Sequence, residues 1–262
     1  MFRSMVAVTA IEHELLRHRL SDSAATTVYV VRHPLRTTRL RVQWLRTPEP
    51  LDRWCRQSRV SEAVVGGFFI RSSASPLGEL WLAGRKASSI AVPDPFGAVR
   101  AAIAIEGGTV RIGRRNELPP GPTGDLLQAG PLLVEDGVVV AQSDDAEGFT
   151  ACADQFDSDI TEGRYPRAAL GLAADELIAV ACDGRRTDVD VGLTLDELGQ
   201  LMVTLGAQDA INLDGGGSTS LVHRGHLLNR PYEAQDVPIV GARAIATALV
   251  FGPARMRARH VA

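Results

Sequence analysis

Residues 210–222 have the sequence AINLDGGGSTSLV, an apolar run followed by an amide, a carboxylate, three glycines and three hydroxyls. The apolar start is typical of a buried strand, and the last two residues can begin the next one. Three consecutive glycines lose much backbone entropy on folding, and a turn needs only one or two of them. The run therefore indicates backbone that approaches a ligand closely or points several N–H groups at one spot.

The polar residues of this run are placed to form a site. Asn212 and Asp214 alternate with apolar residues, so both side chains should leave the same face of the strand. Successive N–H groups at residues 215–217, next to the hydroxyls of Ser218 and Thr219, form a favourable cradle for an anion. The alternative is a glycine-rich hairpin in which Asp214 only caps the turn.

Other short motifs flank this run in a fixed order. They are PRAALG at residues 166–171, DGR at 183–185, GLTLDEL at 192–198, LGA at 205–207, NLDGGGS at 212–218 and RAIATALV at 243–250. In this order they resemble the pattern of the phosphodiester glycosidase family, and the resemblance extends over roughly residues 28–251. It implies a hydrolase that cleaves the glycosidic bond of a sugar 1-phosphodiester, with N-acetylglucosamine as the best-known sugar.

A second glycine-bearing segment, AVVGGFFI at residues 63–70, also belongs to the resemblance. Its functional interpretation is a wall of the site that contains Gly67, with Phe68 or Phe69 offering a ring to a sugar face. The alternative is a strand with a bulge at the glycines. Members of the family usually have Asn where this chain has Val65, and the loss of that polar group predicts a changed specificity.

Apolar segments along the chain predict the fold. Strands are expected at residues 28–31, 40–44, 63–70, 99–105, 110–112, 132–140, 177–182 and 244–251. Together with a few helices they predict an α+β fold, a single domain with a mixed, mostly antiparallel β-sheet core and flanking helices. The domain is expected to occupy residues 27–252, after an N-terminal helix and linker at 1–26 and before a basic tail at 253–262.

Two capping boxes predict helices. TAIE at residues 9–12 precedes three leucines at roughly helical spacing, and it predicts an N-terminal helix that could mediate packing or dimer formation. TLDE at residues 194–197 precedes the apolar face of a second helix, which Gly206 can end. A further short helix is expected around residues 51–56.

Glycosidic cleavage needs a group that stabilises an oxocarbenium-like centre, and a base or nucleophile. Asp214 and Asp183 each come at the end of an apolar strand, so both carboxylates would lie at one sheet edge if the strands are neighbours. Because a phosphate leaving group is already acidic, cations and N–H donors on the phosphate should matter more than acid assistance. Guanidinium groups bind phosphate in a bidentate fork. We therefore predict Asp214, Asp183 and Arg167 as catalytic residues.

The residues predicted to bind substrate come from the same motifs. They are Asn212, Gly215, Gly216, Gly217, Ser218, Thr219, Arg185, Asn229, Arg230, Arg243, Gly67, Phe68 and Phe69. Some of the predicted site residues have a structural alternative. The DGR motif is also a plain hairpin turn, and Arg167 could pair with a surface carboxylate. Arg243 could fix the final strand, and Asn229 could only shape its loop. His223 and His226 are left out, because a lone histidine is more often structural.

The composition limits the classes of molecule that the protein is expected to bind. The chain has 262 residues with a net charge of −3, which gives no basic footprint for a nucleic acid. No stretch is long enough to cross a membrane. The apolar part of the N-terminus is short and runs into charge, which makes it a poor signal peptide and predicts a cytoplasmic protein. The expected partner is a small-molecule sugar phosphate or glycoside, and an oligomer could form through the N-terminal helix.

No motif predicts a cofactor. No Walker-type lysine follows the glycines, which excludes a nucleotide P-loop, and neither HExxH nor CxxC is present to indicate zinc. Three cysteines, an odd number, do not indicate a disulfide framework. A divalent cation at Asp183 or Asp214, together with a phosphate, stays an open alternative. So does a lid or metal site in the polar residues 143–164, whose simpler interpretation is a solvated loop.

The predicted function is thus hydrolysis of a sugar 1-phosphodiester, with Asp214 as the main carboxylate and with arginines and the glycine turn binding phosphate. One alternative is a glycoside hydrolase that acts on a sugar without phosphate. Another is a catalytically silent protein that binds carbohydrate or phosphate.

Overall fold

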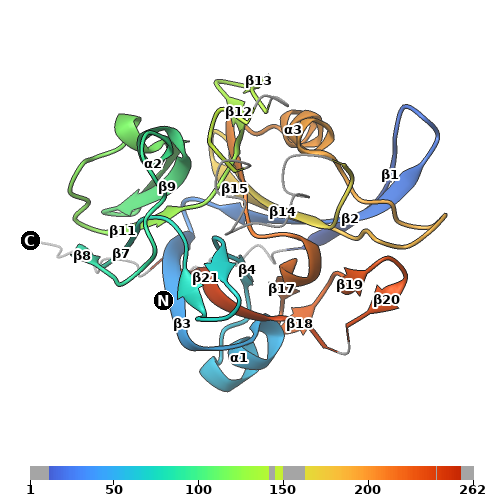
Figure 1. Ribbon diagram of the computed structural model, residues 1–262, viewed down its shortest axis with the longest axis horizontal. Coiled ribbons are helices and arrows are strands. Elements are labelled where there is room, and N and C mark those ends of the chain that lie inside the picture. Colours follow the sequence, from blue (N-terminus) through green and yellow to red (C-terminus); the bar gives the residue numbers. More distant parts are fainter. Residues whose placement is uncertain (1–11, 142–144, 150–162, 240, 255–262) are drawn as a thin grey trace, which may run out of the picture.

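Antiparallel β-sheets make up most of the structure (Figure 1), a computed structural model that describes residues 12–141, 145–149, 163–239 and 241–254. The largest sheet has seven strands. Their order is β1 (His13–Arg19), β2 (Ala25–Pro34), β15 (Glu176–Cys182), β14 (Arg167–Leu172), β16 (Asp209–Asn212), β12 (Leu132–Glu135) and β13 (Val138–Val139).

Two five-stranded sheets lie beside the large one. One has the order β18 (His226–Leu227), β17 (Leu221–His223), β4 (Ala63–Val65), β21 (Ala244–Pro253) and β3 (Thr38–Pro50). The other has the order β10 (Thr109–Arg114), β9 (Ala101–Glu106), β11 (Asp125–Gln128), β7 (Leu80–Leu82) and β8 (Arg85–Lys86). Two short hairpins are formed by β5 (Phe69–Ile70) with β6 (Ser75–Pro76) and by β19 (Tyr232–Ala234) with β20 (Val237–Pro238).

Helices in the described residues are few and short. They are α1 (Leu51–Ser58), α2 (Phe96–Val99) and α3 (Leu195–Thr204), with 3-10 turns η1 (Arg115–Glu117) and η3 (Gly216–Ser218). In Figure 1, α3 lies above the large sheet and α1 lies at the lower end of the molecule.

The main hydrophobic core is shared by the three sheets. One face of the large sheet packs against both smaller sheets, and its other face packs against α3. Strand β15 contributes Leu177, Ala179 and Ala181 to the first face and Ile178 and Val180 to the second. Because both faces are buried, the strand is apolar throughout, as its sequence predicts.

Helix α3 begins at the predicted capping box. Thr194 Oγ1 accepts a hydrogen bond from the backbone N–H of Glu197 (3.1 Å), and Glu197 Oε2 accepts one from the backbone N–H of Thr194 (2.9 Å). Gly206 follows the helix with a φ of +98°, a left-handed conformation that favours glycine. The side chains that the helix buries include Leu195, Leu198, Leu201 and Met202. The predictions of this helix and of the short helix after Pro50 are confirmed.

The prediction of an N-terminal helix is wrong, because the described part of that segment forms strand β1. This strand pairs with β2 over its whole length. Leu16 and Leu20 pack against the cluster beneath α3, whereas Leu15 is exposed. Leucines four residues apart fit both the helical repeat and the period of two of a strand. The segment forms a strand because the edge of β2 offers backbone groups with which it can pair. Residues 9–11 of the capping box lie outside the described residues, and an oligomer through this segment stays a prediction.

The sheets differ from the predicted mixed arrangement. Every pairing between the named strands is antiparallel, and the one parallel contact in the described residues is the isolated bridge between Leu77 and Ile90. Many connections are short hairpins, which cannot make the crossover that parallel strands need. The fold is mostly β, with fewer helices than expected but roughly consistent with an α+β class. The boundaries of the domain at 27–252 stay a prediction.

Several other sequence predictions concern parts of the chain that are only partly described. No helix within the described ranges has the length and apolar character needed to cross a membrane. Cys55 and Cys182 are buried and free. Cys152, most of residues 143–164 and residues 255–262 of the basic tail lie outside the described residues.

Candidate active site

The three residues predicted as catalytic lie at the same end of the seven-stranded sheet. Asp183 directly follows β15, and Asp214 lies two residues beyond the end of β16. These two strands are not adjacent, because β14 lies between them and pairs with both. Since both are antiparallel to β14, they run parallel to each other and end beside its first residue, Arg167.

The Asp214 carboxylate is held by the glycine turn that follows it. Its Oδ1 accepts from the backbone N–H of Gly215 (2.9 Å), and the Ser218 hydroxyl donates to the carboxylate. Its backbone N–H donates to the carbonyl of Gly66 (2.9 Å), next to β4. Burial raises the pKa of Asp214 to about 6, while the Ser218 hydrogen bond and the charge of Arg243 act in the opposite direction. The carboxylate is therefore mostly ionised at neutral pH, as suits a base or nucleophile.

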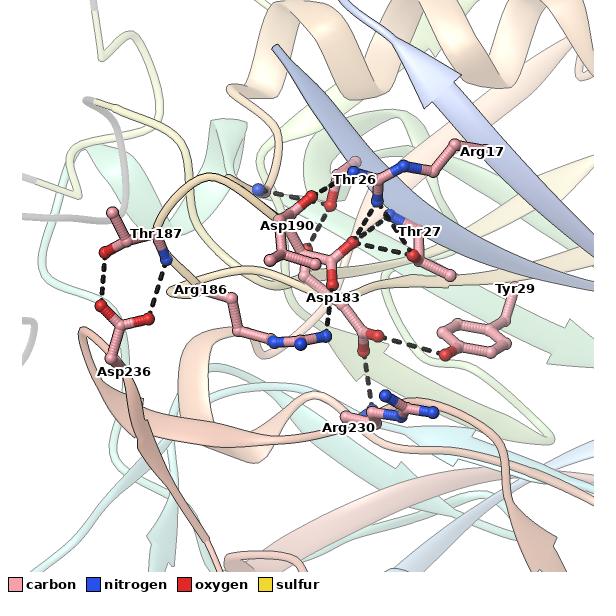
Figure 2. A network of polar contacts seen from close by, with 12 residues as sticks. Arg17, Thr26, Thr27, Tyr29, Asp183, Arg186, Thr187, Asp190, Arg230 and Asp236 are labelled. Carbon is pink, nitrogen blue, oxygen red and sulfur yellow. Dashed lines mark hydrogen bonds and ion pairs between the residues drawn. The ribbon is translucent and has the colours of Figure 1, made fainter.

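Asp183 is buried in a polar network (Figure 2). Its Oδ1 accepts from the backbone N–H of Arg230 (2.7 Å), and its Oδ2 accepts from the hydroxyl of Tyr29 (3.1 Å). Burial raises the pKa of Asp183 to about 6; the charge of Asp190 adds to the rise, and the two hydrogen bonds oppose it. Tyr29 was not predicted, because a tyrosine in an apolar strand is usually a core residue.

Asp190 is a further buried carboxylate that sequence reasoning missed (Figure 2). Its Oδ1 accepts from the backbone N–H and the hydroxyl of Thr27 (2.8 and 2.7 Å) and from Nη1 of Arg17 (2.5 Å). Its Oδ2 accepts from Nη1 of Arg186 (2.9 Å). Burial opposes ionisation, but the bonds from Thr27 and the bond and charge of Arg17 together lower the pKa of Asp190. The residue ties the loop after Asp183 to β1 and β2, and a lone carboxylate between two valines gave no hint of this.

Two of the predicted phosphate-binding arginines lie over the glycine turn. A Cβ built on Gly216 would be 3.2 Å from Nη2 of Arg185, and one built on Gly217 would be 2.6 Å from Nη2 of Arg243. Glycine at position 217 therefore leaves the space that the Arg243 guanidinium occupies. The structure brings both arginines to the turn, although they are 58 positions apart in the sequence (243 minus 185).

A carboxylate of the protein, Glu233 on β19, also lies at these arginines. Its Oε1 forms an ion pair with Nη2 of Arg243 and lies 3.9 Å from Nη1 of Arg71. Nη1 of Arg185 donates to the main-chain carbonyl of Glu233 (2.6 Å). The charges of Arg243 and Arg71 both oppose the rise in the pKa of Asp214. Sequence reasoning missed Glu233 and Arg71, since both lie outside the ordered motifs.

The glycine N–H groups are less available than the predicted anion cradle requires. The N–H of Gly215 donates to Asp214, and the N–H of Gly216 donates to the carbonyl of Pro166 (2.8 Å). Gly216 has a φ of +57°, so glycine is favoured there for conformational reasons alone. This corrects the predicted cradle, because two of its three amides already have acceptors within the protein. The positive charge at the turn comes from Arg185 and Arg243.

Arg167 is buried at the first position of β14. Its Nε donates to the carbonyl of Leu193 (3.1 Å), and its Nη2 donates to the carbonyl of Gly163 (3.3 Å). Its guanidinium also lies over the ring of Tyr165, with 5.6 Å to the ring centroid. These contacts cross-link the segments that flank the sheet end. They favour a positioning role, and direct participation in catalysis stays a prediction.

Asn229 bonds to backbone groups with its side chain, whereas Arg230 reaches the site with its own backbone N–H. Oδ1 of Asn229 accepts from the N–H of Leu221 (2.9 Å), and its Nδ2 donates to the carbonyl of Thr219 (2.8 Å). These bonds favour the alternative in which Asn229 shapes its loop. Arg230 supplies its backbone N–H to Asp183, and its side chain is exposed.

Two buried polar atoms beside the turn have no hydrogen-bond partner among the described residues, Oδ1 of Asn212 and Oγ1 of Thr219. Nδ2 of Asn212 is engaged and donates to the carbonyl of Gly130 (2.9 Å). Because buried polar groups are normally paired, these two oxygens are groups that a ligand or an ordered water can engage.

The predicted wall at β4 is packed more tightly than a sugar platform. Phe68 is buried edge-to-face on Phe149, with ring centroids 5.5 Å apart, which corrects its expected role as an open ring. Phe69 is half-buried. Gly67 donates from its backbone N–H to the Thr247 hydroxyl (3.0 Å). The side chain of Val65 lies in the main core, so it offers no polar group to a substrate.

The two histidines after the glycine turn, His223 and His226, lie in different environments. Nδ1 of His223 pairs with Oε2 of Glu62 (2.8 Å) and both side chains are buried, whereas His226 is exposed. In the parts of the chain that the structure describes, no group of three or more His, Cys, Asp or Glu side chains is arranged to hold a metal ion. A divalent cation at Asp183 or Asp214 stays an open alternative.

The fold is similar to solved structures of low sequence identity. A hypothetical protein from Synechocystis matches with a TM-score of 0.69 and 20% identity, over 92% of this chain and 62% of that one. The catalytic domain of zebrafish N-acetylglucosamine-1-phosphodiester α-N-acetylglucosaminidase, auto-inhibited by its pro-peptide, matches with a TM-score of 0.66 and 19% identity, over 95% and 84% of the two chains. A protein of Burkholderia pseudomallei described as exported matches with a TM-score of 0.63 and 18% identity, over 88% and 75%. The chain thus spans less than two thirds of the Synechocystis protein.

Sequence comparison assigns the family. No curated protein sequence matches the chain. A family model does match, that of the phosphodiester glycosidases, over residues 58–252. These residues include β4, both carboxylate-bearing strand ends and the glycine turn, and the match confirms the resemblance of the ordered motifs. The chain therefore belongs to the phosphodiester glycosidase family.

Proposed function

We propose that this protein hydrolyses the glycosidic bond of a sugar 1-phosphodiester, with Asp214 as the main catalytic carboxylate. The observation that carries the proposal is the position of Arg243 over Gly217, in the turn that follows Asp214, with the charges of Arg243 and Arg71 both acting on the Asp214 carboxylate. A carboxylate beside cations suits a substrate that develops positive charge at its anomeric carbon while a phosphate leaves. The family, which is one of hydrolases, supports the reaction class.

In the proposed reaction water adds to the anomeric carbon, the bond from this carbon to the phosphate oxygen breaks, and a phosphomonoester leaves. The transition state has oxocarbenium character, so an ionised carboxylate can stabilise it or attack it. Asp214, with a pKa of about 6, is in the form required at neutral pH. The leaving phosphate needs neutralisation more than protonation, and Arg243 and Arg71 would supply it.

Asp183 would act as the second carboxylate. Its pKa of about 6 lets it exchange a proton with water near neutral pH, and the bonds from Tyr29 and from the N–H of Arg230 fix its orientation. On the sugar side, Oδ1 of Asn212 and Oγ1 of Thr219, which have no partner among the described residues, are the groups that we propose to contact hydroxyls of the substrate.

The decisive experiment compares matched substrates. The full chain is assayed on a panel of sugar 1-phosphodiesters and aryl glycosides, with and without a chelator. Replacing Arg243 by Ala should slow phosphodiesters at least ~10-fold more than neutral glycosides, because a charged hydrogen bond contributes about 1.5–3 kcal/mol. Arg243→Lys should recover only part of this loss, since an ammonium group cannot make the planar fork. An equal loss on both substrate classes would contradict the proposed phosphate contact.

A glycoside hydrolase that acts without phosphate is the second candidate, and one observation favours it. Glu233 already neutralises Arg243 and approaches Arg71, so these cations have an anionic partner before any ligand binds. Turnover of aryl glycosides but of no phosphodiester in the same panel would establish this reading. Binding without any turnover would indicate the silent carbohydrate- or phosphate-binding protein.

A further inference from the structure

Glu233 joins two arginines that come from distant parts of the chain. Arg71 follows β5, Arg243 immediately precedes β21, and both approach the same Oε1 atom of Glu233. Guanidinium groups that converge on one carboxylate oxygen offer the same donors to a phosphate oxygen. The Glu233 side chain is 47% exposed and that of Arg243 is 16% exposed, so the carboxylate can leave this place more readily than the arginine can.

The arginines that bind the Glu233 carboxylate also act on the catalytic carboxylate, Asp214. Arg243 packs on Gly217, and the charges of Arg243 and Arg71 both act on Asp214. An anion in the place of the Glu233 carboxylate would therefore bind to the same cations that act on Asp214.

We propose that Glu233 is an internal competitor for the ligand: in the free protein its carboxylate occupies an anion subsite formed by Arg71 and Arg243, and it leaves when a phosphate-bearing ligand binds. The identity of the ligand as a sugar 1-phosphodiester rests on the proposed function, whereas the subsite is argued from the arrangement of charges alone. The competitor weakens the binding of every phosphate group at this subsite. A neutral glycoside gains nothing there, because it has no charge with which to displace Glu233.

The hairpin that carries Glu233 has a separate anchor (Figure 2). Asp236 accepts from the backbone N–H of Thr187 (2.8 Å) and from the Thr187 hydroxyl, and its own N–H donates to the carbonyl of Arg185 (2.7 Å). The side chain of Glu233 can thus move away while Asp236 keeps the hairpin in place. Asp236 also provides a matched control, a second carboxylate on the same hairpin that anchors the loop and does not bridge Arg71 and Arg243.

The test is the binding of inorganic phosphate to the full chain, measured by calorimetry at constant ionic strength. We expect Glu233→Gln to bind phosphate at least ~10-fold more tightly than the wild type, because a charge-assisted hydrogen bond no longer has to be broken first. Glu233→Ala should show the same gain. Asp236→Asn should change the affinity by less than about 2-fold, since it leaves the charge at the subsite unchanged. Adding Arg243→Ala to Glu233→Gln should abolish the gain.

Other outcomes overturn the proposal. Equal or weaker phosphate binding by the Glu233 variants would mean that Glu233 holds the arginines in place and does not compete. An equal gain in Asp236→Asn would trace the effect to a loosened hairpin, and a gain that survives Arg243→Ala would place the phosphate elsewhere. Phosphate binding requires no turnover, so a failure of the proposed hydrolysis is a separate result. If hydrolysis is found, Glu233→Gln should lower KM for the phosphodiester more than KM for the matched neutral glycoside.

Discussion

Asp214 combines a turn-capping geometry with a raised pKa, and mutation separates the two roles. Replacing Asp214 by Asn keeps an acceptor for the N–H of Gly215 but removes the charge. We expect the variant to fold and to lose at least ~100-fold in turnover, the usual range for a positioned acid, base or nucleophile. The measurement is steady-state kinetics, with circular dichroism as the control for folding. A folded variant with wild-type turnover would reduce Asp214 to a cap.

The pKa of Asp214 also sets a pH dependence. If the ionised carboxylate is the active form, kcat/KM should be constant well above pH 6 and should fall about tenfold per pH unit below it, because the pKa of Asp214 is about 6. The profile of kcat/KM reports this group in the free enzyme. A rate that rises as the pH falls through 6 would instead indicate that Asp214 or Asp183 acts as a protonated acid.

Gly217 has a role that its sequence context does not reveal. A methyl group at this position would lie 2.6 Å from Nη2 of Arg243, so Gly217→Ala must displace the guanidinium. We expect this variant to lose at least ~10-fold in affinity for inorganic phosphate, the effect of one charged hydrogen bond. Gly121→Ala is the matched control, because a Cβ there meets no atom within 4 Å. Unchanged affinity would show that Gly217 serves the turn alone.

Helix α3 covers one face of the large sheet, and its capping box should contribute measurably to stability. Thr194→Ala removes the acceptor for the N–H of Glu197 and should lower the free energy of unfolding by about 1 kcal/mol. Thr204→Ala, at the other end of the helix, removes an exposed hydroxyl that donates to the carbonyl of Gln200 (2.9 Å), a bond in contact with water, and should cost less. Urea unfolding of both variants tests this difference. Equal effects would mean that packing and not the cap fixes the start of α3.

Secondary structure was predictable where only one period fits the sequence. Strand β15 is continuously apolar and α3 has a capping box at its start and a glycine after its end, so each pattern had one interpretation. The segment of β1 had two interpretations, since the spacing of Leu16 and Leu20 is compatible with a helix and with a strand. The free edge of β2, which decided between them, is a property of the sheet and not of the segment.

The site was predictable only where its residues follow one another along the chain. The NLDGGGS and DGR motifs mark Asp214, Asp183 and the nearby turn, and these residues lie at the same end of the large sheet. Tyr29, Arg71 and Glu233 come close to these residues only through tertiary packing. No local sequence pattern predicts that packing. One of the expected donor amides, that of Gly216, is engaged by the Pro166 carbonyl, which comes from another segment and which the local sequence could not indicate.

Ionisation of the buried Asp183 should make the folded protein less stable at neutral pH than at acidic pH. The pKa of Asp183 rises from an ordinary 3.8 to about 6 on folding, so the folded state binds more protons than the unfolded state between these values. Stability is therefore lost as the pH rises through this window. Asp183→Asn cannot ionise and should be more stable than the wild type by about 1–3 kcal/mol at pH 8, with the gain vanishing near pH 4. Thermal unfolding across this range tests it, and a gain independent of pH would exclude ionisation as the cause.

Strand β14 pairs on both sides along its length, with β15 and with β16, and the turns bearing Asp183 and Asp214 leave from these two partners. A one-residue insertion within β14 would exchange the faces of all following side chains and would break both registers together. Extra residues in the turn at residues 107–108, between β9 and β10, would disturb no such pairing. Homologues should accordingly vary in length at that turn and in other hairpins, while the count of residues from Arg167 to Leu172 stays constant.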